Sequence, residues 1–171
     1  MQKSNLVLIG MPAAGKSSAG IVAAKRLGMR FIDTDLVIQE QTGLTLPELI
    51  AIHGNDGFLS IENEICAALD AQKTIIATGG SVVYGAEAMR HLKETGKIIY
   101  LSIDYNSLCG RLKDLAGRGV AHREGQTLFD LYKERQLLYE TYADVTIHQD
   151  HTELNLTWLV DQIVSCRTGE T

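Results

Sequence analysis

The chain has 171 residues and a formal net charge of −5, with 45% hydrophobic and 22% charged residues. This length suits one domain with a sizeable core, and the acidic charge argues against a general nucleic-acid-binding protein, whose contact surface would be basic. No apolar run approaches the roughly 18 residues of a membrane span, and no signal-peptide layout precedes the first predicted strand. The three cysteines lack metal-ligand spacing. We therefore expect a cytoplasmic protein.

Short apolar runs alternate with longer amphipathic segments along the chain, which is typical of a parallel sheet wrapped by helices. Strands are predicted over residues 5–9, 30–32, 74–77, 97–101 and 144–147. Apolar residues at three- and four-residue steps predict helices over residues 15–27, 46–52, 58–69, 86–95, 105–115, 128–139 and 154–165. We therefore expect an α/β fold in a single domain that spans residues 1–171.

The first predicted strand leads directly into the segment GMPAAGKS at residues 10–17, which matches the pattern GxxxxGK[ST]. Gly10 and Gly15 allow the backbone to curl so that its N–H groups form a nest for phosphate oxygens, and the following helix adds its positive dipole end. Lys16 can reach the outer phosphates, and the Ser17 hydroxyl can ligate Mg²⁺. The segment therefore predicts a site for a nucleoside triphosphate. Its other expected binding residues are Ala13, Ala14 and Ser18.

Two carboxylates, Asp33 and Asp35, follow the second predicted strand. Ligands of open parallel sheets bind at the carboxyl ends of the strands, and alternate positions on an extended chain share a face. We therefore expect both side chains to point toward the phosphate loop. One acid can hold Mg²⁺ through water, and the other can take the proton of an attacking hydroxyl. The alternative is that Asp35 is the N-cap of a helix that begins at Leu36.

Two glycine-containing stretches interrupt the alternation of strands and helices. Residues 42–56 surround a short predicted helix and are interpreted as an excursion from the sheet. Residues 116–126 are cationic and lack apolar periodicity, which predicts a lid that closes over the nucleotide; an exposed basic loop is the alternative. On closure, Arg118 in this segment can stabilise the charge that develops on the transferring phosphoryl group.

Further candidates lie in the second half of the chain. The third predicted strand runs into Gly79 and Gly80, which let the backbone approach a ligand closely, although a tight turn is the alternative. Arg135 can hold a substrate carboxylate by a two-pronged hydrogen bond, whereas most helical arginines are solvated surface residues. Arg111 is the remaining cationic candidate.

With these motifs in order, the chain resembles the shikimate kinases, a branch of the P-loop small-molecule kinases, over essentially its whole length. The resemblance is carried by the phosphate loop, the segment Phe31–Asp35, the glycines after Ala77, Arg118, and Glu134-Arg135 with Tyr139. It implies a three-layer P-loop fold with a five-stranded parallel sheet, an acceptor-binding region near residues 34–62 and a lid near residues 112–127. It also implies transfer of the γ-phosphate of ATP, with Mg²⁺, to a hydroxyl of a small molecule. The acidic net charge and the lack of a membrane-span run predict no nucleic-acid or membrane partner.

The resemblance further implies a role for each matching residue. At the nucleotide and metal, the implied residues are Lys16 and Ser17 for phosphate and Mg²⁺, Asp33 for Mg²⁺ through water, Arg111 near the adenine and Arg118 on the phosphate. At the acceptor, they are Asp35 as base, Gly79 and Gly80 lining the pocket, and Arg135 on the acceptor carboxylate.

Three positions depart from the pattern of the family. Leu59 follows Phe58 where the family has a second carboxylate-binding arginine, and Ser81 replaces a third glycine. Gly119 follows Arg118 where proline is normal.

The departure at Leu59 leaves the identity of the acceptor open. Losing one of two charge-assisted contacts weakens carboxylate binding by roughly 1.5–3 kcal/mol. It also leaves Glu62 without its cationic neighbour, which would suit an acceptor with an ammonium group, such as homoserine. Alternatively, another basic residue restores shikimate binding: Lys3, Lys25 or Arg30. We expect a monomeric shikimate kinase-like enzyme; a kinase with a changed acceptor and a non-catalytic nucleotide-binding protein are the alternatives.

Overall fold

The computed structural model describes residues 3–113, 125–149 and 153–168. In this part of the chain, five parallel strands form one sheet in the order β2-β3-β1-β4-β5. The strands are β1 (Asn5–Ile9), β2 (Arg30–Asp33), β3 (Thr74–Ala77), β4 (Gly96–Ile103) and β5 (Val145–Gln149). The helices are α1 (Lys16–Leu27), α2 (Thr34–Thr42), α3 (Leu46–Ala67), the 3₁₀ turn η1 (Val82–Tyr84), α4 (Ala86–Thr95), α5 (Tyr105–Lys113), α6 (Leu128–Tyr142) and α7 (Leu156–Thr168). The predicted α/β class and five-stranded parallel sheet are confirmed.

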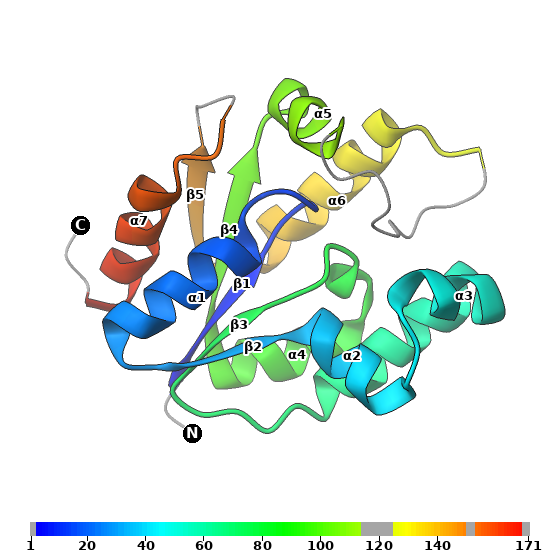
Figure 1. The fold of residues 1–171 in the computed structure, drawn as a ribbon, viewed down its shortest axis with the longest axis horizontal. Helices are drawn as coiled ribbons and strands as arrows, with labels where there is room; N and C mark the ends of the chain where they lie inside the picture. Colours follow the sequence, from blue (N-terminus) through cyan, green and yellow to red (C-terminus); the bar gives the residue numbers. More distant parts are fainter. Residues whose placement is uncertain (1–2, 114–124, 150–152, 169–171) are drawn as a thin grey trace.

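Helices cover both faces of the sheet (Figure 1). On one face α1 and α7 pack against each other, and α1 also contacts β2 and β3. On the other face α4 and α6 contact β4. Every residue of β1 is buried, because this central strand is covered on both sides, as its continuous apolar sequence requires. No described helix has the length and apolar character needed to cross a membrane.

The strand order determines where the loops that carry the motifs meet. From β1 the chain passes to β2 on one side of the sheet, whereas β3 is followed by β4 on the other side of β1. The direction of winding therefore reverses beside β1, which is where open α/β sheets bind their ligands. The phosphate loop after β1, Asp33 at the end of β2 and the glycines after β3 all leave the sheet at this edge.

The interpretation of residues 33–35 as extended chain is wrong, because α2 begins at Thr34. Asp33 is the N-cap of this helix: its side chain accepts a hydrogen bond from the backbone N–H of Asp35 at 3.0 Å. The alternative that made Asp35 the cap is therefore also wrong. The two helices predicted at 46–52 and 58–69 are the two arms of α3, which is kinked at Gly54 (φ 70°, ψ 178°).

The helices α2 and α3 have an apolar cluster of their own, separate from the core around the sheet. Its buried members are Ile38, Leu49 and Phe58. Partly buried residues that pack against them are Leu44, Leu46, Ile50, Leu59, Ile61 and Ile65. We call this set the second cluster. It holds the region near residues 34–62 together at one end of the molecule.

Candidate active site

The phosphate loop turns sharply at the carboxyl end of β1. Gly10 has a positive φ of 147°, and a Cβ atom at this position would lie 2.6 Å from the carbonyl oxygen of Leu101 in β4, so that only glycine fits. The Lys16 side chain is buried, and its Nζ donates to the carbonyl oxygens of Gly10 at 2.7 Å and Met11 at 2.8 Å. Its ammonium group is thus held on the loop itself.

Ser17 and Asp33, the two residues expected at the metal, lie together. The Ser17 hydroxyl donates to Oδ2 of Asp33 at 2.6 Å, while Oδ1 of Asp33 accepts the bond that caps α2. Both side chains offer the hard oxygen atoms that Mg²⁺ prefers. No cluster of three or more His, Cys, Asp or Glu side chains among the described residues is placed to hold a metal ion, so these two would share the ion with phosphate and water oxygens.

The end of β5 braces the opposite side of the phosphate loop through Gln149. This buried side chain donates from Nε2 to the carbonyl oxygen of Ala14 at 3.0 Å and accepts at Oε1 from Arg111 at 3.1 Å. Arg111 also donates to the carbonyl oxygen of Ala13 at 3.3 Å. The structure therefore brings Arg111 to the phosphate loop. Sequence reasoning missed Gln149, whose sole signal is a polar residue ending a strand that leads to the ligand edge.

The acceptor-side candidates converge around Gly79. A Cβ atom on Gly79 would collide with Oε1 of Glu62 and would lie 2.9 Å from Oδ1 of Asp35. The backbone N–H of Gly79 donates to the hydroxyl of Thr34, the first residue of α2, at 3.2 Å. The end of β3, the first turn of α2 and the second arm of α3 therefore meet at one point, and the absent side chain of Gly79 leaves room for two carboxylates.

Glu62 is almost completely buried, with 1% of its surface exposed. Its Oε2 accepts a hydrogen bond from the Ser81 hydroxyl at 2.6 Å. Burial raises the pKa of Glu62 to about 7, and the charge of Asp35 adds to the rise, while the Ser81 hydrogen bond and the charges of Arg135 and Lys16 oppose it. This carboxyl group can therefore change its charge near neutral pH.

Arg135 lies next to Gly80 and is buried, with 1% of its surface exposed, so the alternative of a solvated helical arginine is wrong. Its Nη1 would lie 3.0 Å from a Cβ atom on Gly80. Its guanidinium carbon lies 5.5 Å from the ring centroid of Tyr84, an aromatic partner that sequence reasoning missed. From the same helix, the Tyr139 hydroxyl donates to the carbonyl oxygen of Gly80 at 2.5 Å.

Part of the predicted site lies beyond what the structure describes. Arg118 falls outside the described residues, as does most of the lid predicted near residues 112–127, since residues 114–124 are not described. The first described side chain that interacts after this segment is Gln126, whose Nε2 donates to Oε2 of Glu134 at 3.0 Å. Glu134 also accepts a hydrogen bond from the Tyr84 hydroxyl at 2.6 Å. Gln126 is therefore linked through Glu134 to η1, the turn that follows the glycines.

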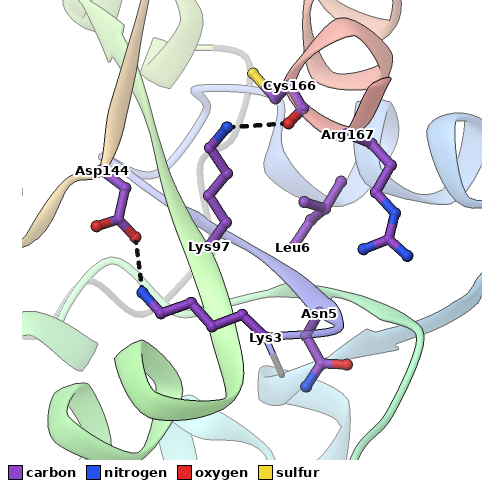
Figure 2. A pocket seen from close by; sticks show the side chains of 7 residues that line it. All are labelled: Lys3, Asn5, Leu6, Lys97, Asp144, Cys166 and Arg167. Atoms are coloured by element: carbon purple, nitrogen blue, oxygen red, sulfur yellow. Dashed lines mark hydrogen bonds and ion pairs between the residues drawn. The ribbon is translucent and has the colours of Figure 1, made fainter. Parts of the chain in front are cut away.

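None of the basic residues considered as replacements for the missing arginine lies at this edge. Lys3 forms an ion pair with Asp144 at 3.6 Å and lines a cavity of about 420 Å³ at the amino ends of β1 and β4 (Figure 2). Lys97 in the same cavity donates to the carbonyl oxygen of Cys166 at 3.0 Å. Arg30 begins β2, and Lys25 is exposed in the last turn of α1, which leads to that same end of the sheet.

The sequence matches one family along most of its length. A family model described as shikimate kinase matches residues 12–166. The shikimate kinase of Haemophilus influenzae strain PittEE is 36% identical over 167 residues, which cover 95% of this chain and 92% of that protein. Shikimate kinase 2 of Yersinia pseudotuberculosis serotype O:3 is 31% identical over 174 residues, which cover 96% of each.

Solved structures give the same relationship. The shikimate kinase from Acinetobacter baumannii in complex with shikimate superposes with a TM-score of 0.85 at 28% identity, covering 99% of this chain and 96% of that one. Shikimate kinase from Aquifex aeolicus gives a TM-score of 0.78 at 25% identity, with 96% of each chain covered. A gluconokinase from Sinorhizobium meliloti, at 16% identity and a TM-score of 0.54, shares the fold alone.

Proposed function

Because this chain belongs to the shikimate kinase family, and is accordingly an ATP-dependent kinase with an alcohol acceptor, we propose that it phosphorylates shikimate at the edge where β1, β2 and β3 end. The observation that carries the proposal is the pairing of charges across two consecutive glycines. Gly79 faces the carboxylates of Asp35 and Glu62, and Gly80 faces the guanidinium of Arg135. A small acid that also bears a hydroxyl fits this polarity, with its carboxylate at Arg135 and its hydroxyl at Asp35.

The donor and acceptor sides of this edge are in direct contact. Pro12, within the phosphate loop, would lie 3.0 Å from a Cβ atom on Gly80, and the charge of Lys16 acts on Glu62. A triphosphate on the loop would therefore have its outer phosphate beside an acceptor held at the glycines. This proximity supports direct transfer between the two substrates.

In the proposed reaction, Asp35 takes the proton of the acceptor hydroxyl while the hydroxyl oxygen attacks the γ-phosphorus of ATP. The new oxygen–phosphorus bond forms as the bond to the β–γ bridging oxygen breaks, and that electron pair leaves with ADP. Lys16 and Arg118 offset the negative charge that develops on the phosphoryl oxygens. Arg135 holds the acceptor carboxylate, which fixes the hydroxyl at Asp35.

The residues present fit Mg²⁺, because Ser17 and Asp33 bring two oxygen donors together beside the phosphate loop. We assign them to the ion, Asp33 through water. When bound, Mg²⁺ would neutralise charge on the outer phosphates of ATP. Ser18, Ala13, Ala14 and Gly15 complete the proposed phosphate site, with Arg111 on its adenine side.

A hydroxy amino acid such as homoserine is the second candidate acceptor, and Leu59 is the observation that favours it. Leu59 packs in the second cluster, so no cation joins Arg135 from this position. A single arginine would hold a carboxylate more weakly than two, by roughly 1.5–3 kcal/mol. The adjacent carboxylates could offset that loss for an acceptor that carries an ammonium group.

We further propose that the kinase acts in the cytoplasm as a monomeric, single-domain enzyme. Its three cysteines, Cys66, Cys109 and Cys166, are free thiols, as expected in a reducing compartment. ATP, the co-substrate that the family uses, supports the same compartment.

The test is a coupled assay of ADP release with Mg²⁺ and a panel of shikimate, homoserine, threonine, serine and gluconate. We expect turnover with shikimate at a KM in the micromolar-to-millimolar range. Turnover with homoserine alone would identify the second candidate, and no turnover with any hydroxyl compound would overturn the proposed kinase function. Lys16→Ala is the nucleotide control and should lower activity at least about 100-fold.

A further inference from the structure

Two of the three departures from the family pattern, Leu59 and Ser81, concern the same buried carboxylate. The side chain that hydrogen-bonds to Glu62 among the described residues is Ser81, whose hydroxyl donates to Oε2 at 2.6 Å. Ser81 is itself buried, with 5% of its surface exposed, so this bond is shielded from water. Leu59 lies one turn before Glu62 on α3 and packs into the second cluster. The carboxylate is therefore anchored by a neutral hydroxyl from position 81, and the apolar side chain at position 59 gives it no hydrogen bond.

The second oxygen of the carboxylate is directed at the acceptor site. Oε1 of Glu62 is buried and has no hydrogen-bond partner within the described part of the chain. It is the atom that a Cβ on Gly79 would strike, on the same side of the glycine as Oδ1 of Asp35. A buried carboxylate oxygen without a partner is costly, and it gains most from a donor that arrives with the substrate.

We propose that Ser81 is a positioning residue for acceptor recognition: it holds Glu62 so that Oε1 receives a hydrogen bond from a second donor group of the acceptor. This inference rests on the proposed kinase function and deepens it. The acceptor class is a small hydroxy acid with one carboxylate, one hydroxyl to be phosphorylated, and one further donor that faces Glu62. That donor is either a second hydroxyl, as in a polyhydroxy acid, or the ammonium of a hydroxy amino acid.

The geometry explains why the hydroxyl must come from position 81. Ser81 follows Gly80 directly and precedes η1, so its backbone is set by the same segment that faces Arg135. Tyr139 fixes this segment through the carbonyl oxygen of Gly80. Two consecutive residues, Gly80 and Ser81, therefore lie against the guanidinium and the anchored carboxylate of the acceptor site.

The first experiment compares Ser81→Ala with Ser81→Thr in the full chain, using the coupled assay. We expect Ser81→Ala to raise the acceptor KM about 10-fold or more and to leave the KM for ATP unchanged, because a single anchoring bond to a charged group is lost. Ser81→Thr keeps the hydroxyl and should restore most of the affinity. An unchanged acceptor KM in Ser81→Ala would overturn the inference.

A matched control separates positioning from stability. Ser107 is also buried and donates to a carboxylate, Oδ2 of Asp104 at 2.5 Å, directly after β4 and not beside the glycines that follow β3. Ser107→Ala should lower the melting temperature and leave the acceptor KM unchanged. An increase in acceptor KM in both serine variants would show that general destabilisation is responsible and would reject the positioning role.

The variant Glu62→Gln distinguishes the two kinds of donor. The glutamine carbonyl still accepts from a hydroxyl but no longer attracts a cation, so the KM should change only a few-fold for a polyhydroxy acid and at least about 10-fold for a hydroxy amino acid. Failure of the kinase proposal has a different signature, because the unaltered chain would then release no ADP with any acceptor. Turnover by the unaltered chain with equal acceptor KM in all Ser81 and Glu62 variants would reject this inference alone.

Discussion

The carboxyl group of Glu62 links its burial to the pH dependence of folding. Its pKa rises from about 4.5 in the unfolded chain to about 7 in the folded chain, chiefly because burial disfavours the charged form. The folded protein therefore binds this proton more tightly than the unfolded chain does. The corresponding stability is fully present below about pH 4.5 and is lost as the pH rises through about 7.

We predict that Glu62→Gln stabilises the protein more at pH 8 than at pH 5. The amide removes the buried charge and can still form a hydrogen bond with the Ser81 hydroxyl, so the gain at pH 8 should approach, at most, about 3 kcal/mol. Urea unfolding of both proteins across this pH range, without nucleotide, measures the difference. Parallel stability curves for the two proteins would contradict the pKa shift.

We predict that Asp35→Asn lowers kcat by about 10²- to 10⁴-fold and leaves the KM for ATP nearly unchanged, because the change removes a proton acceptor. Asp33 supplies the cap of α2, so the fold near this site should persist in the variant. Steady-state kinetics and the melting temperature together test the prediction. A large loss of stability with a small effect on kcat would show that Asp35 is structural.

At the scale of elements, α3 shows how one glycine shapes the region proposed to bind the acceptor. Gly54 adopts φ 70° and ψ 178°, a combination that side-chain-bearing residues almost never occupy, and it divides α3 into two arms. The first arm contributes Leu49 to the second cluster, and the second arm carries Phe58 and Glu62. The kink therefore lets one helix pack on α2 and also reach the glycines after β3.

We predict that Gly54→Ala destabilises the protein by about 1–3 kcal/mol, entirely through backbone strain. Beyond the adjoining backbone, no described atom lies within 4 Å of a Cβ built at this position, so a clash with another part of the described chain is excluded. The control is Gly110→Ala in α5, an exposed helical site with equally open space, which should stabilise by about 0.5–1 kcal/mol. If both variants shift the unfolding midpoint in the same direction, strain at Gly54 is not the cause.

The sequence predicted the elements whose signals are local and missed those that depend on a neighbour. All five strands were predicted within one or two residues of their ends, because each is a short apolar run in a sheet covered on both faces. The helix α2 was missed, since Asp33, Thr34 and Asp35 suit an extended motif equally well, and the cap that Asp33 forms becomes visible only in three dimensions. The kink at Gly54 was likewise predicted as a break between two helices, because the continuity of α3 becomes visible only in three dimensions.

For the site, the motif residues were identified and their partners were not. Sequence motifs identified Lys16, Ser17 and Asp33, because the phosphate loop holds these residues in a fixed arrangement. The missed contacts join residues that lie 19 to 135 positions apart in the sequence, so no short motif encodes them. They are the contacts made by Gln149, Tyr84 and Ser81. Burial of Arg135 likewise required the packing of α6 against η1.

At the scale of the whole molecule, the described residues form two apolar cores of unequal size. The core around the sheet includes residues from every strand except β2, whose Phe31 and Ile32 pack against it partly buried. The second cluster has three fully buried side chains. Because local stability follows buried apolar contact, the region of α2 and the first arm of α3 should open more readily than the sheet.

We predict that backbone amides in α2 and the first arm of α3 exchange with solvent at least about 10-fold faster than those of β1 and β4. Hydrogen exchange measured by mass spectrometry, with and without the acceptor found in the kinase assay, tests this. Acceptor binding should slow exchange in α2 and have little effect at the amino ends of the strands. Uniform exchange rates across both regions would indicate a single cooperative unit.

The second cluster is separate from the core around the sheet, so a substitution in one of them need not disturb the other. Leu59 belongs to this cluster, and the triphosphate-handling loop rests on the larger core. A substitution in the second cluster can therefore change the packing of α2 and α3 and leave the packing beneath the phosphate loop unchanged.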